Sequence, residues 1–369
     1  MLVVSRKNVG IWKIAIMYCE LPFYHFFIDG NIVKPCCYNT EMYHQTNSDF
    51  NDINLVEFRQ EMLSGAIPKS CSPCKIKENA GVTSYREYNQ ELHPNPVYEH
   101  ENGVMISKPF TFDIRLDNIC NMKCVMCGPS QSSKWLEDVD VYKEHIDPRV
   151  NYKQTRNERI NNTDSIIELL KNNANFISLL GGEPFQMKSA NKILSALTEW
   201  NRKNTTILIT TNAYLTSDND LFKVLSKFEK VYFMISIDGY GDVNDYIRYP
   251  SKWNEFLNGV NILKNNSLMV KFNLTVSALN LCDIHNVENF AKTMNTELIL
   301  NELTKPDLLG ISSLKPSVVE NVISNNEIKE ILNGYSYQEN LNKRLRRYLH
   351  ALDQKRNTNS RETLPWCWV

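Results

Sequence analysis

The sequence lacks a surplus of charge of either sign. Its 369 residues hold 41 Lys and Arg against 42 Asp and Glu, a formal net charge of −1. Nucleic-acid-binding proteins usually carry a basic excess, so we expect no nucleic-acid partner. With 42% hydrophobic and 22% charged residues, the composition is that of a globular protein rather than a disordered or fibrous one.

Long apolar runs are also missing. The run around Val231–Ile237 is far too short to span a membrane, so we expect no membrane association. The N-terminal segment has basic residues inside its apolar part and no small-residue cleavage site, which argues against a secretory signal. These features predict a cytoplasmic protein.

Repeats and low-complexity tracts are absent as well, and from about residue 110 the sequence has a βα rhythm instead. Short β-rich runs alternate with longer helix-like segments, which indicates a parallel sheet. The expected strands are Phe110–Asp117, Phe176–Leu180, Thr206–Thr211, Val231–Ile237, Leu268–Ser277 and Glu297–Leu303. The expected helices are Ser130–His145, Ser189–Asn201, Asp218–Phe228, Ser251–Asn265 and Asp283–Met294. The sequence therefore predicts an α/β fold with a partial (β/α)6 TIM-like barrel.

Two further regions flank this barrel. Residues 1–105 lack the rhythm and contain five of the ten cysteines, so we expect a small auxiliary domain that a metal staples together. The barrel would occupy residues 106–305. Residues 306–369 would form a C-terminal helical extension, with helix over roughly 326–355, followed by a short tail.

The sequence is rich in cysteine, and three of its ten cysteines lie within eight residues. Cys120, Cys124 and Cys127 follow the first expected barrel strand, at the end of the barrel where chemistry is usually found. They could be buried thiols, or a zinc site completed by Cys71 or Cys74. Alternatively, three thiolates could ligate a [4Fe–4S] cluster and leave its fourth iron open.

The stretch CNMKCVMC, Cys120–Cys127, resembles the cysteine motif of the radical S-adenosylmethionine (SAM) enzymes. This resemblance implies a [4Fe–4S] cluster on the three cysteines, with SAM bound at the open iron. Reductive cleavage of SAM would release a 5′-deoxyadenosyl radical, which abstracts hydrogen from a substrate. Met126 stands where the family prefers an aromatic residue close to adenine.

Further barrel segments resemble SAM-binding motifs of the same family. The GGEP stretch implies contacts to the SAM ammonium, and the others imply contacts to its ribose or carboxylate. The residues concerned are Gly181, Gly182, Glu183, Pro184, Thr211, Asn212, Ser236, Asp238 and Arg248. Taken alone, Asn212, Asp238 and Arg248 could equally be turn or surface residues.

A second cysteine set lies in residues 1–105. Segments from Cys19 through DGNIVKPCC and CSPC to Gly81–Arg86 resemble the twitch domain, a shortened relative of the SPASM domain. This resemblance implies an auxiliary [4Fe–4S] cluster on Cys19, Cys36, Cys71 and Cys74. Spacing alone leaves zinc open as the alternative. The sequence departs from the pattern because this domain precedes the barrel and the gap from Gly30 to Cys36 is one residue longer.

The remaining cysteines have no clear motif: Cys37 adjoins Cys36, Cys282 is expected to be buried, and Cys367 is expected to pack with the tail. The resemblance implies a radical SAM enzyme that acts on a peptide or protein, with a flavodoxin- or ferredoxin-like reductant. A radical SAM enzyme for a small molecule, such as a sugar or nucleotide derivative, is one alternative. The other is a non-catalytic zinc- or cluster-binding scaffold.

Overall fold

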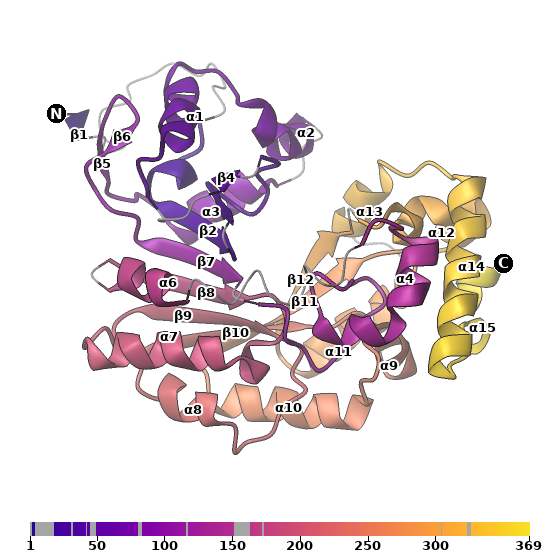
Figure 1. Ribbon diagram of the computed structural model, residues 1–369. Coiled ribbons are helices and arrows are strands. Elements are labelled where there is room, and N and C mark those ends of the chain that lie inside the picture. The colour runs from indigo at the N-terminus through magenta and orange to yellow at the C-terminus, as the bar shows by residue number, and fades with distance from the viewer. Residues whose placement is uncertain are drawn as a thin grey trace.

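The computed structural model describes residues 2–3, 18–30, 32–41, 43–44, 49–79, 83–115, 117–150, 163–171, 173–303, 305–322 and 326–369. Its main element is a nine-stranded sheet with the order β12-β11-β10-β9-β8-β7-β2-β3-β4 (Figure 1). The strands from β12 to β2 run parallel, β3 is antiparallel to β2, and β4 is antiparallel to β3.

Six of the parallel strands are those predicted from the sequence. They are β7 (Thr111–Arg115), β8 (Phe176–Leu180), β9 (Thr206–Thr211), β10 (Lys230–Ser236), β11 (Met269–Val276) and β12 (Glu297–Glu302). Side chains alternate between two environments along β9, where Ile207 and Ile209 are buried and Leu208 and Thr210 are half-buried. The predicted partial barrel is confirmed.

Helices cover the outer face of this sheet. They are α6 (Thr163–Leu170), α7 (Lys188–Glu199), α8 (Asp220–Leu225), α9 (Asp242–Ile247), α10 (Trp253–Asn265) and α11 (Ile284–Thr293). Four match predicted helices, whereas α6 and α9 were not predicted. The predicted helix Ser130–His145 is instead a 3₁₀ helix, Ser133–Asp138, followed by α4 (Val139–His145).

Close packing of α10 depends on a glycine. A Cβ atom added to Gly259 would lie 1.7 Å from the carbonyl oxygen of Ala213, in the loop after β9. Two non-bonded heavy atoms cannot approach so closely, so only glycine allows the helix to touch this loop.

The N-terminal part joins the barrel sheet directly. β2 (His25–Asp29) pairs in parallel with β7, with His25 opposite Thr111 and Asp29 opposite Arg115. β3 (Ile32–Lys34) and β4 (Tyr43–His44) continue the sheet. A separate three-stranded sheet contains β1 (Leu2–Val3), β5 (Glu99–Glu101) and β6 (Val104–Met105).

Three helices complete this part: α1 (Ile53–Leu63), α2 (Ser72–Asn79) and α3 (Tyr85–Leu92). The fully buried Arg59 on α1 ties this helix to two segments outside the strands. Its guanidinium donates to the carbonyl oxygens of Pro22 and Phe50 at 2.6 and 2.8 Å and lies over the Phe50 ring. A buried cation is tolerated because its donors are satisfied by backbone oxygens.

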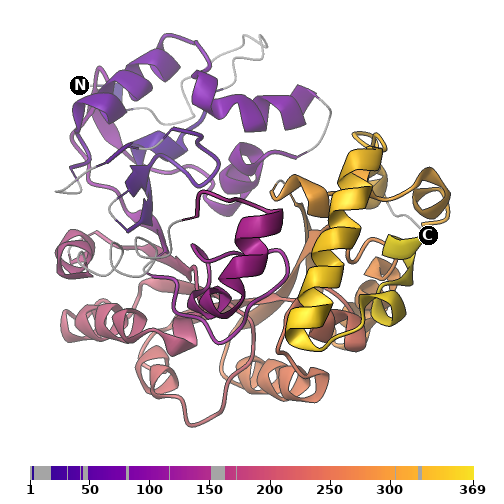
Figure 2. The ribbon, with the colours of Figure 1, turned by 45° about the vertical axis from the view of Figure 1, so that its right-hand side comes forward.

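The C-terminal part is helical, as predicted, but the predicted stretch is two helices. α12 (Pro316–Val319) precedes α13 (Asn326–Leu332), and the long α14 (Glu339–Arg356) follows after residues 333–338. α15 (Ser360–Thr363) and a final 3₁₀ helix, Pro365–Trp368, end the chain. α14 lies beside α4 along one side of the barrel (Figure 2). Among the described helices, none has the length and apolarity needed to cross a bilayer.

Candidate functional site

The cysteine loop, Cys120–Cys127, lies between β7 and the 3₁₀ helix. Its three thiols lie within electrostatic reach of one another, with Cys124 buried and the other two half-buried. The loop pairs with the end of α9: the Val125 amide donates to the Ile247 carbonyl at 2.7 Å. The Lys123 amide donates to the Tyr249 carbonyl at 2.8 Å in the same way.

Side chains from two other segments hold the carbonyl groups of this loop. The Ser132 hydroxyl donates to the Met122 carbonyl, and the Trp135 indole donates to the Cys124 carbonyl at 2.9 Å. The Tyr348 hydroxyl, from α14, donates to the Val125 carbonyl at 3.1 Å. These hydrogen bonds hold the backbone of the loop in place around the three cysteines.

Two of the three thiols share a hydrogen bond. The contact with Cys127 lowers the pKa of Cys124 to about 7, against the effect of burial, and the nearby guanidinium of Arg248 lowers it further. The same hydrogen bond, together with burial, raises the pKa of Cys127. These contacts thus favour a thiolate at Cys124, the form that binds metal.

The Gly-Gly-Glu-Pro segment lies against the start of the cysteine loop. Gly181 and Gly182 have φ angles of +81° and +50°, and a Cβ on Gly182 would come within 2.3 Å of the Ile119 carbonyl oxygen. The Glu183 amide donates to that oxygen at 2.7 Å. Glycine is therefore required at 182 both for its backbone angle and for this close approach.

The Glu183 carboxylate is buried and bound by groups of the chain itself. It accepts from the Thr211 hydroxyl at 2.7 Å and from the Asn212 amide at 2.8 Å, and from the Phe185 amide at 3.2 Å. Burial raises its pKa, and these hydrogen bonds oppose that shift. Glu183 therefore joins the ends of β8 and β9, a role that the sequence did not predict.

Asn212 connects β9 to the cysteine loop. Its side-chain amide donates to Asn121 Oδ1 at 2.8 Å, and Asn121 in turn donates to the Tyr214 carbonyl at 3.0 Å. This pair brings the two predicted site segments together, although they lie about ninety residues apart in sequence.

Asp238 and Arg248 form a buried ion pair beside the cysteines. Asp238 Oδ2 accepts from Arg248 Nη1, and Asp238 Oδ1 accepts from the Thr275 amide at 3.2 Å. The Arg248 Nε atom is buried and has no hydrogen-bond partner among the described residues. Arg248 can therefore still donate to an anionic ligand group, whereas both oxygens of Asp238 are already bonded.

The other predicted site residues lie around the same end of the barrel. Ser236 ends β10 with a half-buried side chain. Met126 is half-buried and packs against the core, and Pro184 is buried at the start of a short 3₁₀ helix.

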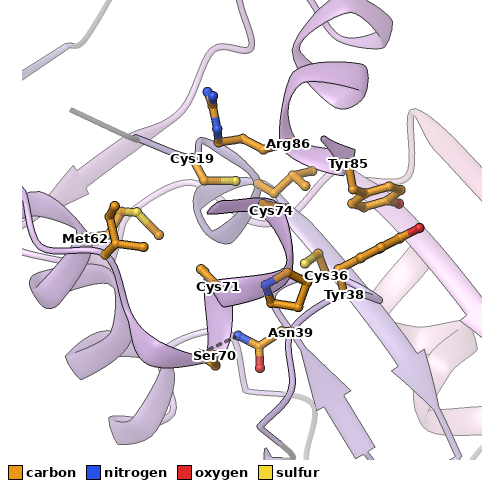
Figure 3. Close-up of a pocket in the computed structure, with 13 residues that line it drawn as sticks. Cys19, Cys36, Tyr38, Asn39, Met62, Ser70, Cys71, Cys74, Tyr85 and Arg86 are labelled. Carbon is orange, nitrogen blue, oxygen red and sulfur yellow. Dashed lines mark hydrogen bonds between the residues drawn. The ribbon is translucent and has the colours of Figure 1, made fainter. Parts of the chain in front are cut away.

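The second cysteine set surrounds a separate cavity in the N-terminal part (Figure 3). Cys19, Cys36, Cys71 and Cys74 line it together with Tyr85 and other residues, and its volume, including space open to solvent, is about 420 Å³. Burial raises the pKa of Cys19, Cys36 and Cys71 above the ordinary thiol value. Gly81 and Val82, part of the twitch-like segment, lie outside the described residues.

Cys37 does not line this cavity. Its thiol is hydrogen-bonded to Tyr85 and lies near Asp113 and Arg115 of β7. It therefore faces the barrel sheet rather than the four neighbouring thiols.

The last two cysteines lie near each other at the C-terminal tail. The prediction that Cys282 is buried is wrong, because its side chain is exposed in the turn before α11. Cys367 is buried, as expected, and its thiol donates to the Ala278 carbonyl at 3.4 Å. The Trp366 indole donates to the same oxygen at 3.0 Å, so the tail packs on the loop after β11.

The described residues contain no group of three His, Cys, Asp or Glu side chains placed to hold a single metal ion. A tetrahedral zinc site would need thiol sulfurs that converge on one point about 2.3 Å away. Both cysteine sets are grouped without such convergence. Thiolate donors suit both zinc and iron–sulfur clusters, so the cysteines alone leave both metals open.

The sequence from β7 to α11 matches a known family. Residues 114–293 match the model of the Radical SAM superfamily. This segment is similar to that family over just under half of the chain. The matched segment contains the cysteine loop, the Gly-Gly-Glu-Pro segment and the Asp238–Arg248 pair.

Solved structures with similar folds include anSMEcpe with bound AdoMet, at 18% identity and a TM-score of 0.39, covering 54% of this chain and 52% of that one. They also include anSMEcpe with bound AdoMet and the Cp18Cys peptide, at 17% identity and a TM-score of 0.39, covering 68% and 62%. SuiB of Streptococcus suis matches at 14% identity and a TM-score of 0.37, covering 93% and 70%. This chain thus spans less than two thirds of the length of anSMEcpe. No curated protein is significantly similar to this sequence.

Proposed function

We propose that this protein is a radical SAM enzyme, in which Cys120, Cys124 and Cys127 ligate a [4Fe–4S] cluster that binds SAM. When bound, the cluster supplies one electron for the reductive cleavage of SAM to methionine and a 5′-deoxyadenosyl radical, which abstracts hydrogen from the substrate. The match of residues 114–293 to the Radical SAM superfamily supports this proposal.

The proposal rests on the observation that Cys120, Cys124 and Cys127 lie close together and that no fourth cysteine lies with them. Four other cysteines line their own cavity, and Cys37 contacts Tyr85. Cys367 lies in the C-terminal tail, with Cys282 of the turn before α11 near it. One iron of a cube at the cysteine loop would therefore lack a thiolate, which is the arrangement that an exogenous ligand needs.

The surrounding residues would bind and orient SAM. The free Nε of Arg248 would donate to the SAM carboxylate, with the guanidinium held in place by Asp238. Gly181 and Gly182 would allow the methionine part to approach the backbone. Glu183 would set the positions of Thr211 and Asn212 and add negative charge near the SAM ammonium. Ser236 and Met126 would lie along the ribose and adenine.

We extend the proposal to a second [4Fe–4S] cluster on Cys19, Cys36, Cys71 and Cys74 in a twitch-like domain at residues 1–105. The barrel would then span 106–305, and the extension 306–369. Four thiols around one cavity support this assignment. Full ligation by four cysteines favours a role in electron transfer over direct binding of the substrate.

The substrate class and cell compartment rest on the family resemblance and the sequence alone. A peptide or protein substrate is proposed on that basis, with a small sugar- or nucleotide-derived molecule as the second candidate. A flavodoxin- or ferredoxin-like protein would supply the electron, in the cytoplasm.

Metal analysis and SAM cleavage test the proposal together. Anaerobically purified protein should be brown, with about eight irons and eight sulfides per chain, twice the content of one cube. It should release 5′-deoxyadenosine from SAM when reduced with dithionite. Cys124→Ala should abolish this release, and Cys74→Ala should lower the iron content to about four.

Cys37→Ala and Cys282→Ala are the matched controls, since neither thiol is a proposed ligand. Both variants should keep the full iron content. Colourless protein with stoichiometric zinc, or 5′-deoxyadenosine release that survives Cys124→Ala, would refute the proposal and favour the scaffold alternative.

A further inference from the structure

One helix, α14, covers the outside of the cysteine loop. The Tyr348 hydroxyl on its buried face reaches the Val125 carbonyl, between Cys124 and Cys127. Near its C-terminal end, Arg356 bonds to Asp138 at 2.7 Å and stacks on the Trp135 ring at 4.8 Å. Trp135 in turn donates to the Cys124 carbonyl. A single layer of side chains thus separates the helix from the cysteines.

The same helix concentrates positive charge. It carries six basic side chains against two acidic ones, in a chain whose net charge is −1. Lys343 is 62% exposed, Arg347 and His350 are exposed, and Lys355 is 37% exposed. These residues form the outward face of α14, which Figure 2 shows along one side of the molecule.

Stability of the fold does not require this basic face. The buried side of α14 is already filled by Leu341, Leu345, Leu349 and Leu352. The ion pairs of Lys343 with Glu339 and of Lys355 with Asp140 are exposed, and such pairs contribute little. The six basic side chains of α14 still outnumber Glu339 and Asp353 on the helix and Asp138 and Asp140 beside it. Such a net positive charge raises the rate at which an acidic protein finds a surface.

We propose that the basic face of α14, defined by Lys343, Arg347, His350 and Lys355, docks an acidic protein that carries one electron. The inference rests on the proposed function and adds where its reductant binds. In each encounter the carrier loses one electron and the cysteine-loop site gains it. The path from this face passes through the Tyr348 ring and its hydrogen bond to Val125.

Three properties favour a protein donor over a nucleic acid on this face. The basic residues follow one helix of 18 residues, the patch lies directly outside the cysteine loop, and the rest of the chain is slightly acidic. A nucleic-acid site would need a longer basic surface that follows a phosphate backbone.

Charge reversal with two electron sources tests the proposal. The double variant Lys343→Glu/Arg347→Glu is compared with the unmodified protein, using either dithionite or an acidic flavodoxin that its reductase keeps reduced. Lys192→Glu/Lys223→Glu, on the neighbouring helices α7 and α8 away from α14 (Figure 1), is the matched control, because both lysines are exposed and in surface ion pairs. Binding of the flavodoxin to each protein is also measured by calorimetric titration at low and high salt.

We expect the α14 variant to form 5′-deoxyadenosine at the normal rate with dithionite. With flavodoxin its rate should fall roughly 10- to 100-fold, and the flavodoxin should bind more weakly by a similar factor. High salt should weaken binding to the unmodified protein, and the control variant should behave like it. The milder Lys343→Gln/Arg347→Gln should give a smaller loss in the same direction.

Unchanged flavodoxin binding in the α14 variant would overturn the proposal, as would an equal loss in the control. Tighter binding of a 20-base-pair DNA duplex than of flavodoxin, lost in the α14 variant, would also overturn it and assign the face to nucleic acid. Absence of 5′-deoxyadenosine with dithionite in the unmodified protein would instead refute the proposed function. The binding titration still decides the docking surface in that case.

Discussion

The Tyr85 hydroxyl donates a 3.0 Å hydrogen bond to Asp113 Oδ2. Tyr85 begins α3 and lines the cavity of the second cysteine set, whereas Asp113 belongs to β7 of the barrel. Burial raises the pKa of Tyr85, so the phenol stays protonated and can donate at any physiological pH. One hydrogen bond therefore links the wall of the N-terminal cavity to the barrel sheet.

Removing this donor should weaken the protein. Tyr85→Phe leaves the mostly buried Asp113 carboxylate with fewer donors, so we expect the free energy of unfolding to fall by about 1–2 kcal/mol. Urea unfolding under anaerobic conditions, followed by tryptophan fluorescence, measures it. Tyr88→Phe on the same helix is the control, since Tyr88 is 37% exposed, and should change stability by less than about 0.5 kcal/mol. Equal effects of the two variants would contradict the role of the hydrogen bond.

The Asp238–Arg248 pair should matter for SAM affinity. Asp238→Asn removes the charge that holds the Arg248 guanidinium, so the dissociation constant for SAM should rise at least about tenfold. A SAM titration of cluster-containing protein, with iron content checked, measures this. Asp242→Asn on the exposed side of α9 is the control and should bind SAM normally. Normal SAM affinity in Asp238→Asn would show that Arg248 needs no fixed partner.

Gly259 should be intolerant of any side chain. Gly259→Ala would force the new methyl group against the Ala213 carbonyl oxygen, so α10 must move away, at a cost of roughly 2–4 kcal/mol. Thermal unfolding should show a lower melting temperature. At Gly334 an added Cβ meets only the Ile331 oxygen, at 3.9 Å, so Gly334→Ala should leave the melting temperature nearly unchanged. An unchanged melting temperature in Gly259→Ala would mean that the loop after β9 moves aside at little cost in free energy.

Acid should destabilise the protein through His93. Burial, with a smaller effect of His25, lowers the pKa of His93 to about 4, and Asp113 opposes the shift. An unfolded histidine takes up its proton near pH 6.5, so between pH 6.5 and about 4 the unfolded state binds more protons. The stabilising effect of neutral His93 is thus complete above pH 6.5 and is lost as the pH falls.

His93→Gln should reduce this dependence. The loss in melting temperature between pH 7 and pH 5 should become smaller by roughly 1–2 °C. Part of the slope should remain, because burial lowers the pKa of His25 as well. An unchanged slope would mean that His93 is protonated in the folded state at pH 5. His285→Gln is the control, because the His285 side chain is 48% exposed. This variant should leave the slope unchanged.

The barrel could be predicted from the sequence because its strands are local signals. Runs such as Thr206–Thr211 alternate buried and half-buried positions within six residues, and periodicity detects that pattern directly. The pairing of β2 with β7 could not be predicted in this way. The run His25–Asp29 is mostly buried without clear alternation, and nothing in its residues specifies a partner about 85 positions away.

The sequence was enough to predict which residues form the candidate site, but not which of these residues contact one another. The family resemblance predicted Glu183, Asn212, Asp238 and Arg248 as site residues, but not that Glu183 binds the Asn212 amide or that Asp238 binds Arg248. Such contacts depend on where loops from different strands meet. Cys282 was misjudged because cysteine is usually buried, whereas this one lies in an exposed turn.

The shared sheet has a consequence for dissecting the molecule. β2 forms hydrogen bonds along the whole of β7. A shortened chain that starts at residue 106 would therefore leave the hydrophobic β7 as an exposed edge strand. Unpaired edge strands can pair with strands of other molecules, which causes aggregation. Precipitation of such a fragment would report the missing neighbour rather than any weakness of the barrel itself.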